Sequence, residues 1–427
     1  MEGKGECAVK TLYYDTVVIG GGPAGIAAAI KTREKGLKTL LIENRDVLGG
    51  IPLQCIHPGF GIHYYKQDLT GTEFITRLLD KLVESKTEYL TKTYVHSIEY
   101  IDYNDKVVNV ISPSGVLEVH AETIIYATGA RERHIFEIGV YGDRVDGVYT
   151  AGEAQTLMDI FGVLPGREVV VIGSGDVGLI MARRFALEGA RVKAVVEILP
   201  YPGGLMRNVV QCLRDYDIPL LLGHTVVKII GKKRVEKVIV AKVDENLKII
   251  PGTEFEIPCD TVIVSAGLRP NIDLLEKIGV VIDPATGGPV VNEYLETSKP
   301  GIFVAGNALV INDLVDYAVE QGERAAEGAH KFVENNGLPS EKWIRVVKGR
   351  NIRLIVPHYI SGKREVVLYA RVSQPEKNVY IEIPEVNYRV FSYGVRPSEM
   401  IRIKLKPEHF KKMSSDDKIT IQVTPRQ

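Results

Sequence analysis

The sequence lacks the features that mark several large classes of protein. Only four cysteines occur, Cys7, Cys55, Cys212 and Cys259, and none belongs to a C-x-x-C pair. This spacing argues against a disulfide framework, a zinc site or an iron–sulfur cluster held by this chain alone. No apolar run is long enough to span a membrane, and the residues before Asp15 contain no apolar core of signal-peptide length. We therefore expect a soluble, cytoplasmic protein with no membrane span and no metal site.

An excess of charge of one sign is also missing, since 53 lysines and arginines oppose 54 aspartates and glutamates in 427 residues. A balanced charge produces no strong field that would attract nucleic acid or acidic lipid. We therefore expect no nucleic-acid partner. The length is sufficient for several domains with sizeable buried cores.

A glycine-rich turn follows the first apolar segment of the chain. The β-branched run Thr16–Ile19 suits a buried parallel strand, and the Ala-rich stretch from Pro23 to Lys35 suits a helix. The glycines of this turn match the pattern G-x-G-x-x-G, and they are Gly20, Gly22 and Gly25. That pattern lets the backbone approach a pyrophosphate at the N-terminus of a helix.

An acidic residue completes this unit. The next strand-like run, Thr39–Ile42, leads into Glu43, which lies 18 residues after Gly25. A carboxylate at the tip of that strand can accept hydrogen bonds from a ribose diol. Strand, glycines, helix, second strand and acid in this order predict a dinucleotide-binding site.

The same order of features returns downstream. Gly173, Gly175 and Gly178 repeat the glycine spacing, and Glu197 follows Gly178 by 19 residues. Two such units in one chain imply two dinucleotides, which is a more specific signal than either unit alone.

Glu197 also bears on the choice of nicotinamide cofactor. A carboxylate beside the ribose repels a 2′-phosphate, and the next three residues (ILP) include no arginine that could bind one. This favours NADH over NADPH. Arg207 can fold back toward the ribose, which would weaken that preference.

Three further segments resemble motifs of one superfamily. They are Thr123–Gly129 (TIIYATG), Thr261–Gly267 (TVIVSAG, followed by LRPN) and Thr297–Gly306 (TSKPGIFVAG). With these five ordered motifs, the chain resembles the two-dinucleotide-binding-domain flavoproteins of the pyridine nucleotide-disulfide oxidoreductase superfamily over about residues 11–335. In that superfamily the first unit binds FAD, and the second, inserted within the first, binds NAD(P)H.

The resemblance implies an α/β fold with two Rossmann-like FAD/NAD(P)-binding domains. The FAD-binding domain is expected over residues 11–155 and 266–337, with the NAD-binding domain inserted over residues 156–265. From about Pro339, strand-like runs separated by turns predict an all-β, sandwich-like C-terminal domain over residues 338–427. That domain is either a structural cap or a docking module for a partner subunit.

The fingerprints and the resemblance together assign residues to the two cofactors, FAD and NAD(H), with NADP less favoured. The residues expected to hold FAD are Gly20, Gly22, Pro23, Ala24, Gly25, Glu43, Gly50, Val95, Ala127, Thr128, Gly129, Gly306 and Asn307. Those expected to hold NAD are Gly173, Ser174, Gly175, Asp176, Val177, Gly178, Glu197 and Gly267. Asn307 stands where relatives usually carry an aspartate, and an asparagine can still accept one hydrogen bond from the ribityl chain.

Two departures from the superfamily argue against a dithiol reductase. Disulfide reductases carry C-x-x-x-x-C at the place where this chain has only Cys55, in GGIPLQCIHPGFG. They also carry a glutamate just after the NAD-site glycines, where this chain has Ile180. The segment GVYTAGEAQTLMDIFGVLPGREVVVIG is more similar to the subunit-type flavoproteins associated with opine oxidases, proline dehydrogenases and glycerol-3-phosphate dehydrogenases. Such flavoproteins typically work in complexes, which implies one or more partner subunits.

Cys55 is the candidate catalytic residue, with two interpretations. It can be a lone redox thiol beside the flavin, activated by His57, or a buried and inert cysteine. A helix expected near Asn312–Gly322, with Asn312 as its cap, would place its N-terminus near the flavin and stabilise the negative charge of the reduced ring.

The sequence therefore predicts an oxidoreductase that transfers a hydride between NADH and FAD and relays electrons to or from a partner dehydrogenase subunit. One alternative is a stand-alone NADH oxidase or single-cysteine disulfide reductase that uses Cys55. The other is a non-catalytic subunit whose dinucleotide folds serve assembly.

Overall fold

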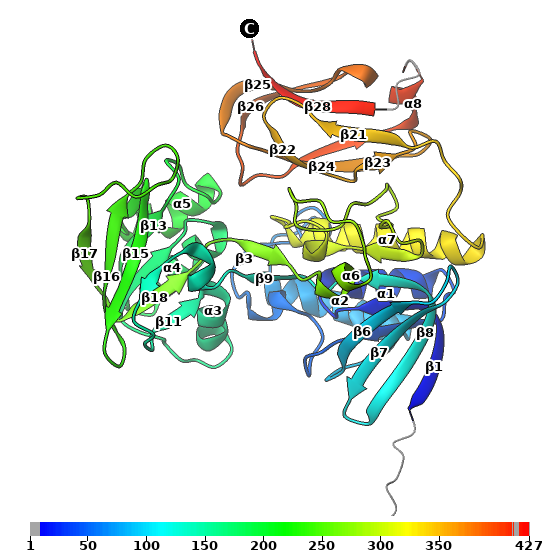
Figure 1. Ribbon diagram of the computed structural model, residues 1–427, viewed down its shortest axis with the longest axis horizontal. Coiled ribbons are helices and arrows are strands. Elements are labelled where there is room, and N and C mark those ends of the chain that lie inside the picture. The colour runs from blue at the N-terminus through cyan, green and yellow to red at the C-terminus, as the bar shows by residue number, and fades with distance from the viewer. Residues whose placement is uncertain (1–8, 412, 414–417, 427) are drawn as a thin grey trace, which may run out of the picture. The chain divides into compact units, whose positions relative to one another are not determined.

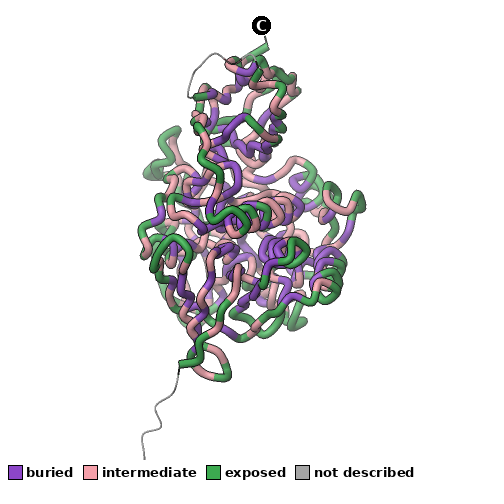
Figure 2. The backbone as a smooth tube through the Cα atoms, turned by 90° about the vertical axis from the view of Figure 1, so that its right-hand side faces the viewer, coloured by how far each residue is buried: buried purple, intermediate pink, exposed green. Residues whose placement is uncertain are grey.

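The computed structural model describes residues 9–411, 413 and 418–426, so Cys7 lies outside the described part of the chain (Figure 1). The chain forms two compact units. The first contains the described residues up to 130 and from 270 onward, and the second contains residues 131–269. Figure 2 shows buried residues (purple) along the strands and helices and exposed residues (green) mainly in the connecting loops.

The first unit is built on a seven-stranded sheet. Its strands are β1 (Lys10–Ile19), β2 (Thr39–Ile42), β5 (Glu88–Leu90), β6 (Tyr94–Tyr100), β7 (Lys106–Ser112), β8 (Gly115–Tyr126) and β20 (Ile302–Val304). β5, β2, β1, β8 and β20 pair in parallel, whereas β8, β7 and β6 form an antiparallel meander. β1 begins earlier than the run predicted at Thr16, because its first half pairs with the first half of β8.

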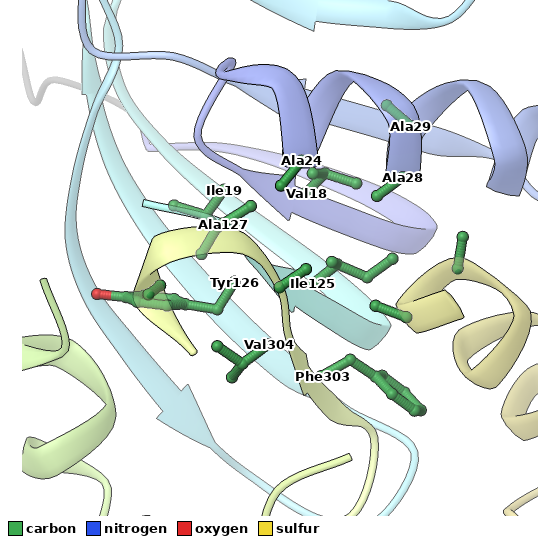
Figure 3. Close-up of a cluster of buried hydrophobic side chains, with 14 of the residues drawn as sticks. Val18, Ile19, Ala24, Ala28, Ala29, Ile125, Tyr126, Ala127, Phe303 and Val304 are labelled. Carbon is green, nitrogen blue, oxygen red and sulfur yellow. The ribbon is translucent and has the colours of Figure 1, made fainter. Parts of the chain in front are cut away.

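Helices cover the parallel part of this sheet. They are α1 (Pro23–Glu34) and α7 (Val315–Glu334), whereas α2 (Gly71–Ser85) packs on α1 and α6 (Asp273–Lys277) lies against β6. A short ribbon is formed by β3 (Pro58–Phe60) and β4 (Leu69–Thr70). α1 and α7 pack closely on each other, which the small residues of α1 permit. Figure 3 shows Ala24 and Ala28 of α1 beside the strands that carry Val18, Ile19 and Ile125. All five side chains are buried.

The second unit contains a five-stranded parallel sheet in the order β11-β18-β12-β13-β14 and a four-stranded sheet in the order β10-β15-β16-β17. Its strands are β10 (Tyr141–Gly142), β11 (Val148–Thr150), β12 (Glu168–Ile172), β13 (Arg191–Glu197), β14 (Leu220–Leu222), β15 (His224–Gly231), β16 (Val235–Lys242), β17 (Phe255–Pro258) and β18 (Thr261–Val264). Its helices are α3 (Ala151–Asp159), α4 (Asp176–Leu187) and α5 (Met206–Cys212), and a two-stranded ribbon is formed by β9 (Ala130–Glu132) and β19 (Leu268–Pro270).

This unit begins at residue 131 and therefore before residue 156, where the sequence places the start of the NAD-binding domain. β11 pairs in parallel with β18. Ala151, Ala154 and Met158 of α3 belong to the same buried cluster as Leu179 of α4. The strand and helix that precede the second fingerprint thus complete its sheet and core.

In its described residues, the C-terminal region is all-β apart from the short helix α8 (Pro407–Phe410) and a 3-10 turn, η5 (Pro384–Val386). It has a five-stranded sheet in the order β23-β21-β28-β25-β26 and a three-stranded sheet in the order β22-β24-β27. The strands are β21 (Ile344–Lys348), β22 (Ile352–Val356), β23 (Tyr359–Ile360), β24 (Val366–Val372), β25 (Glu376–Ile383), β26 (Tyr388–Val395), β27 (Ile401–Leu405) and β28 (Lys418–Pro425). One hydrophobic cluster lies between the two sheets, as in a β-sandwich. The predicted fold class, with two Rossmann-like domains and an all-β C-terminal region, is confirmed.

Candidate functional site

The first glycine fingerprint folds into a tight turn between β1 and α1. Gly20 has φ +106°, and an added Cβ there would lie 2.4 Å from the carbonyl oxygen of Ala127. An added Cβ at Gly25 would lie 1.8 Å from the carbonyl oxygen of Gly20, so helix and turn are in direct backbone contact. At Gly22 the same atom would meet nothing within 4 Å. The turn therefore leaves open space where the N–H groups at the start of α1, near Pro23 and Ala24, have no helical partner.

Glu43 is held at the edge of this turn. Its side chain is buried, and its two carboxylate oxygens accept hydrogen bonds from the backbone N–H of Gly21 (2.7 Å) and of Arg45 (2.8 Å). The backbone N–H of Thr93 donates to the carbonyl oxygen of Glu43 (2.9 Å). This bond brings the start of β6, and with it Val95, to the side of the turn where Glu43 lies.

The loop that contains Gly50 covers the fingerprint turn. The backbone N–H of Gly49 donates to the carbonyl oxygen of Gly21 (2.8 Å). Gly50 has φ +66°, and an added Cβ there would lie 3.0 Å from Cα of Gly22. A larger residue at Gly50 would therefore be both strained and crowded against the turn.

The residues that follow β8 also lie beside the first fingerprint turn. Ala127 packs against Gly20, and the Thr128 hydroxyl donates to the carbonyl oxygen of Asn271 (2.8 Å). Asn271 in turn donates its backbone N–H to the carbonyl oxygen of Gly129 (3.0 Å). Asn271 was not among the predicted site residues, although its motif, LRPN, was noted in the sequence.

The segment after β20 differs from the prediction. α7 begins at Val315 with Leu314 as its N-cap, so the predicted capping role of Asn312 is wrong. The Asn312 amide instead bonds to Gln321, which is buried and also accepts a hydrogen bond from the backbone N–H of Gly306 (3.0 Å). This tertiary network, rather than the local sequence, sets the conformation of the segment.

Asn307 belongs to the same network. Its side-chain oxygen accepts hydrogen bonds from the backbone N–H (3.0 Å) and the amide (3.3 Å) of Asn312. Both of these hydrogen bonds to the Asn307 oxygen are therefore made within the chain.

Asp316 is a buried carboxylate that the sequence did not reveal. On the second residue of α7, it accepts hydrogen bonds from the backbone N–H groups of Gly61 (3.2 Å), His63 (2.9 Å) and Tyr64 (2.7 Å). It thus fixes the segment after Cys55 to the N-terminus of α7. No local pattern marked this residue, because its partners lie about 250 residues away in the sequence.

Cys55 contacts its own loop and the start of α2. Cys55 is buried, its Sγ lies 3.4 Å from the carbonyl oxygen of Ile51, and its Cβ packs against Gly71 at the start of α2. His57 Nδ1 lies 3.0 Å from the carbonyl oxygen of Pro58. Burial raises the pKa of the Cys212 and Cys259 thiols to about 11 and about 12, which keeps both of them protonated at neutral pH.

The second fingerprint, in the second unit, repeats the geometry of the first. Gly173 has φ +94°, and an added Cβ there would lie 2.2 Å from the carbonyl oxygen of Ser265. An added Cβ at Gly178 would lie 2.7 Å from the carbonyl oxygen of Gly173, whereas one at Gly175 would meet nothing within 4 Å. The exposed Val177 lies in the first turn of α4, and Gly267 has φ +94° just beyond β18.

Glu197 lies at the end of β13, as Glu43 lies just after β2. One of its carboxylate oxygens accepts hydrogen bonds from both the backbone N–H and the hydroxyl of Ser174, and the other accepts one from the backbone N–H of Leu199 (2.9 Å). The backbone N–H of Gly203 donates to the Ser174 hydroxyl (2.8 Å), so the segment after Glu197 is held against the turn.

Asp176 also holds that segment. One of its carboxylate oxygens accepts hydrogen bonds from the backbone N–H of Leu205 (2.8 Å) and the amide of Asn208 (2.6 Å). Arg207 is exposed, and Ile180 packs against the buried core of the unit.

Among the described residues, no helix is both long and apolar enough to cross a bilayer. The same part of the chain contains no group of three or more histidine, cysteine or carboxylate side chains placed to hold a metal ion.

Known proteins are similar to this chain in sequence and in fold. Residues 14–322 match the family described as pyridine nucleotide-disulphide oxidoreductase. Mitochondrial dihydrolipoyl dehydrogenase of Caenorhabditis elegans is 29% identical over 367 residues, covering 78% of this chain and 71% of that protein. An opine oxidase subunit of Agrobacterium tumefaciens is 27% identical over 326 residues, covering 69% of this chain and 61% of that protein. The thioredoxin reductase structure of Lactococcus lactis has a TM-score of 0.62 and 24% identity, covering 75% of this chain and 99% of that one.

The matched region contains both fingerprints and their two acidic residues. Members of this family use FAD and NAD(P)H, and the two glycine turns of this chain are consistent with FAD and NAD(H). The chain belongs to the pyridine nucleotide-disulphide oxidoreductase family and is an FAD- and NAD(P)-dependent oxidoreductase.

Proposed function

We propose that this protein transfers a hydride between NADH and FAD and exchanges the electrons with a partner dehydrogenase subunit. The observation that carries the proposal is that the same glycine turn occurs twice in one chain. In each turn an added Cβ would collide with the backbone at the first glycine and would meet nothing at the second, and a buried glutamate lies beside the turn. FAD, when bound, supplies two-electron exchange with the nicotinamide ring. The protein supplies binding, orientation and charge around it.

The first turn and its walls would hold FAD. In this proposal the backbone around Gly22 and the N-terminus of α1, at Pro23 and Ala24, bind the pyrophosphate, and Glu43 binds the ribose. The other residues proposed to contact FAD are Gly20, Gly25, Gly50, Val95, Ala127, Thr128, Gly129, Gly306 and Asn307.

The second turn would hold NADH in the same manner. The turn comprises Gly173, Ser174, Gly175, Asp176, Val177 and Gly178, with Gly267 on the neighbouring strand end. Glu197 is buried and negatively charged beside the expected ribose, which disfavours a 2′-phosphate. Arg207 is exposed, and the Glu197 carboxylate accepts hydrogen bonds from Ser174 and Leu199. These two observations support NADH over NADPH.

Two observations support a partner subunit as the electron acceptor or donor: the state of the cysteines and the name of one relative. In the described part of the chain, Cys55, Cys212 and Cys259 are all buried and none of them forms a disulfide. The C-x-x-x-x-C pair through which disulfide reductases pass electrons is absent as well, because no second cysteine lies between Cys55 and Cys212. One relative, the opine oxidase subunit, is by its name a single component of an oxidase. Electron exchange with another protein explains a flavin site without a dithiol.

The second candidate is a stand-alone NADH oxidase or single-cysteine disulfide reductase that uses Cys55. The observation in its favour is the position of Cys55, five residues after Gly50. The backbone of Gly50 lies against the first fingerprint turn, which is the proposed FAD site. A thiol in this loop can lie close to the bound cofactor. Its burial argues against direct reaction with a large disulfide substrate.

Reoxidation of the NADH-reduced protein distinguishes the two candidates. For the relay, we expect slow reoxidation by oxygen and by small disulfides, unchanged in Cys55→Ser, and rapid reoxidation by a flavin- or haem-containing chain that copurifies from native cells. Rapid turnover on a disulfide or on oxygen that Cys55→Ser abolishes would establish the second candidate instead. The Cys212→Ser variant is the matched control, because Cys212 is equally buried but lies in the second unit.

A further inference from the structure

We infer that the C-terminal β-sandwich is part of the FAD site, and that Arg371 of β24 is the positioning residue through which it acts. By this inference Arg371 fixes the backbone of residues 306–313, here called the FAD loop, beside the first fingerprint. The inference rests on the FAD site proposed above, but it does not depend on the electron relay.

The first step concerns the two faces of β24, all of whose residues are buried. Val366, Leu368 and Ala370 belong to the hydrophobic cluster of the sandwich. Val367 and Tyr369, which point to the opposite face, belong to the large cluster that also contains the core of the FAD-binding sheet. β24, the central strand of the three-stranded sheet, is therefore buried on both of its faces.

Arg371 lies on this second face and is 7% exposed. Its guanidinium donates hydrogen bonds to the carbonyl oxygens of Pro397 (3.0 Å) and Ile311 (3.0 Å) and forms an ion pair with Asp313. The other carboxylate oxygen of Asp313 accepts a hydrogen bond from the backbone N–H of Met400 (2.6 Å). Ile311 and Asp313 of the FAD loop are thus held by the sandwich through part-buried hydrogen bonds. Those from the Arg371 guanidinium are charge-assisted and therefore stronger than neutral ones.

The FAD loop lies next to the fingerprint helix. It follows β20, so it emerges from the carboxyl edge of the parallel strands, where α/β sheets bind their ligands. An added Cβ at Gly306 would lie 2.8 Å from Cβ of Ala24, and one at Gly322 would lie 2.1 Å from the carbonyl oxygen of Ala24. A displacement of this loop therefore moves the surface that faces the start of α1.

The loop is held from its other side by the chain's own amides. Asn307, Asn312 and Gln321 form the network described above, which connects the loop to α7. On α7 itself, Glu320 accepts a hydrogen bond from the Tyr369 hydroxyl (2.7 Å) and pairs with Arg402 of β27. The sandwich thus holds both the loop and the first turns of the helix that follows it.

This arrangement gives the sandwich a role besides that of a cap or a docking module. If Arg371 is removed, Asp313 loses this cationic partner at a position where its side chain is only 12% exposed, which is costly unless the loop moves. Movement of the loop disturbs the surface beside Ala24 and the start of α7, whose partial positive charge favours a reduced, anionic cofactor. We therefore expect weaker FAD binding and a more negative flavin midpoint potential.

The test uses the full chain and compares Arg371→Met with Arg371→Lys and Arg389→Met. Arg389 is the matched control, because it is an exposed arginine on β26 of the same sandwich and pairs only with Glu382 among the described acidic residues. FAD is titrated into the apo-proteins, and the midpoint potential and thermal unfolding of each variant are recorded. For Arg371→Met the FAD dissociation constant should rise by about tenfold or more, with a more negative potential. Arg371→Lys should recover part of both changes, and Arg389→Met should match the wild type.

Several outcomes would overturn the inference. One is a folded Arg371→Met protein that binds FAD with the wild-type dissociation constant and potential, whatever its melting temperature. Another is an equal change in Arg389→Met. If Arg371→Met cannot be recovered folded, Asp313→Asn replaces it, since it keeps the shape of the side chain and removes the charge that faces Arg371. An Asp313→Asn protein with unchanged FAD affinity and potential would contradict the inference, whereas failure of the wild-type chain to bind FAD would instead refute the FAD site.

Discussion

Glu197 and Glu43 occupy equivalent positions in the two fingerprints, so the same substitution should impair a different cofactor at each position. Each carboxylate accepts hydrogen bonds at both oxygens, from Ser174 and Leu199 at Glu197 and from Gly21 and Arg45 at Glu43. Glutamine can present an oxygen to only one side, and its NH2 group would then face a backbone donor. One buried polar group is left unsatisfied, at a cost of about 1–3 kcal/mol.

That cost falls on the folded chain with or without cofactor and should lower its stability. The affinity for the cofactor should fall for a separate reason, because the substitution also removes an oxygen that is proposed to accept a hydrogen bond from the ribose diol. About 1.4 kcal/mol corresponds to tenfold in a dissociation constant, so Glu197→Gln should weaken NADH binding roughly tenfold and leave FAD retention unchanged. Glu43→Gln should weaken FAD binding and leave the NADH dependence of the flavin-loaded enzyme unchanged. Loss of the negative charge at Glu197 should also narrow the preference for NADH over NADPH.

The assay is rapid-mixing reduction of the flavin at increasing NADH and NADPH concentrations, together with FAD titration of the apo-proteins. The concentration dependence of the reduction rate separates nicotinamide affinity from the rate of hydride transfer. If Glu197→Gln loses FAD while its NADH dependence is unchanged, the assignment of the two turns is reversed. If neither variant affects either cofactor, the turns do not bind dinucleotides in the way proposed.

Three further predictions follow from particular contacts. Gly25→Ala should abolish FAD binding, because the alanine Cβ would lie 1.8 Å from the carbonyl oxygen of Gly20. An apo-protein of this variant that binds FAD with wild-type affinity in titration would contradict this prediction. Burial lowers the pKa of Lys106 to about 8 from an ordinary value of 10.5. Between these two pH values the unfolded chain binds more protons than the folded chain, so the free energy of unfolding should rise with pH in this range. Chemical denaturation should show that rise in the wild type and a smaller one in Lys106→Met, and identical pH dependence in the two proteins would refute it. Asp316→Asn replaces one acceptor oxygen by a donor that faces the N–H groups of residues 61–64, so this segment should become more susceptible to proteolysis. Unchanged cleavage of the segment in limited proteolysis would contradict this role of Asp316.

The fingerprints could be predicted because their rules are local. The spacing of three glycines and the position of one acid are set by the geometry of a single strand–turn–helix unit, and Gly20, Gly22 and Gly25 each take the position which that geometry requires. The alternation of strand-like runs and turns likewise indicated the C-terminal sandwich.

The residues that were missed act through tertiary contacts. Asp316 and Arg371 find their partners far away in the sequence, so no window of neighbouring residues marks them. Asn312 illustrates the opposite error. Asparagine before an amphipathic stretch is a typical cap, but Gln321 and Asn307 bind its side chain, and α7 begins three residues later. Tertiary hydrogen bonds prevailed over the local preference at this position.

Anaerobic titration of the purified, FAD-loaded protein with NADH tests the central claim most directly. The account predicts that one equivalent of NADH bleaches the visible flavin band, and that Glu197→Gln shifts this reduction to higher NADH concentration. A protein that binds no FAD, or a flavin band that NADH leaves unchanged both alone and with the copurifying partner present, would contradict it.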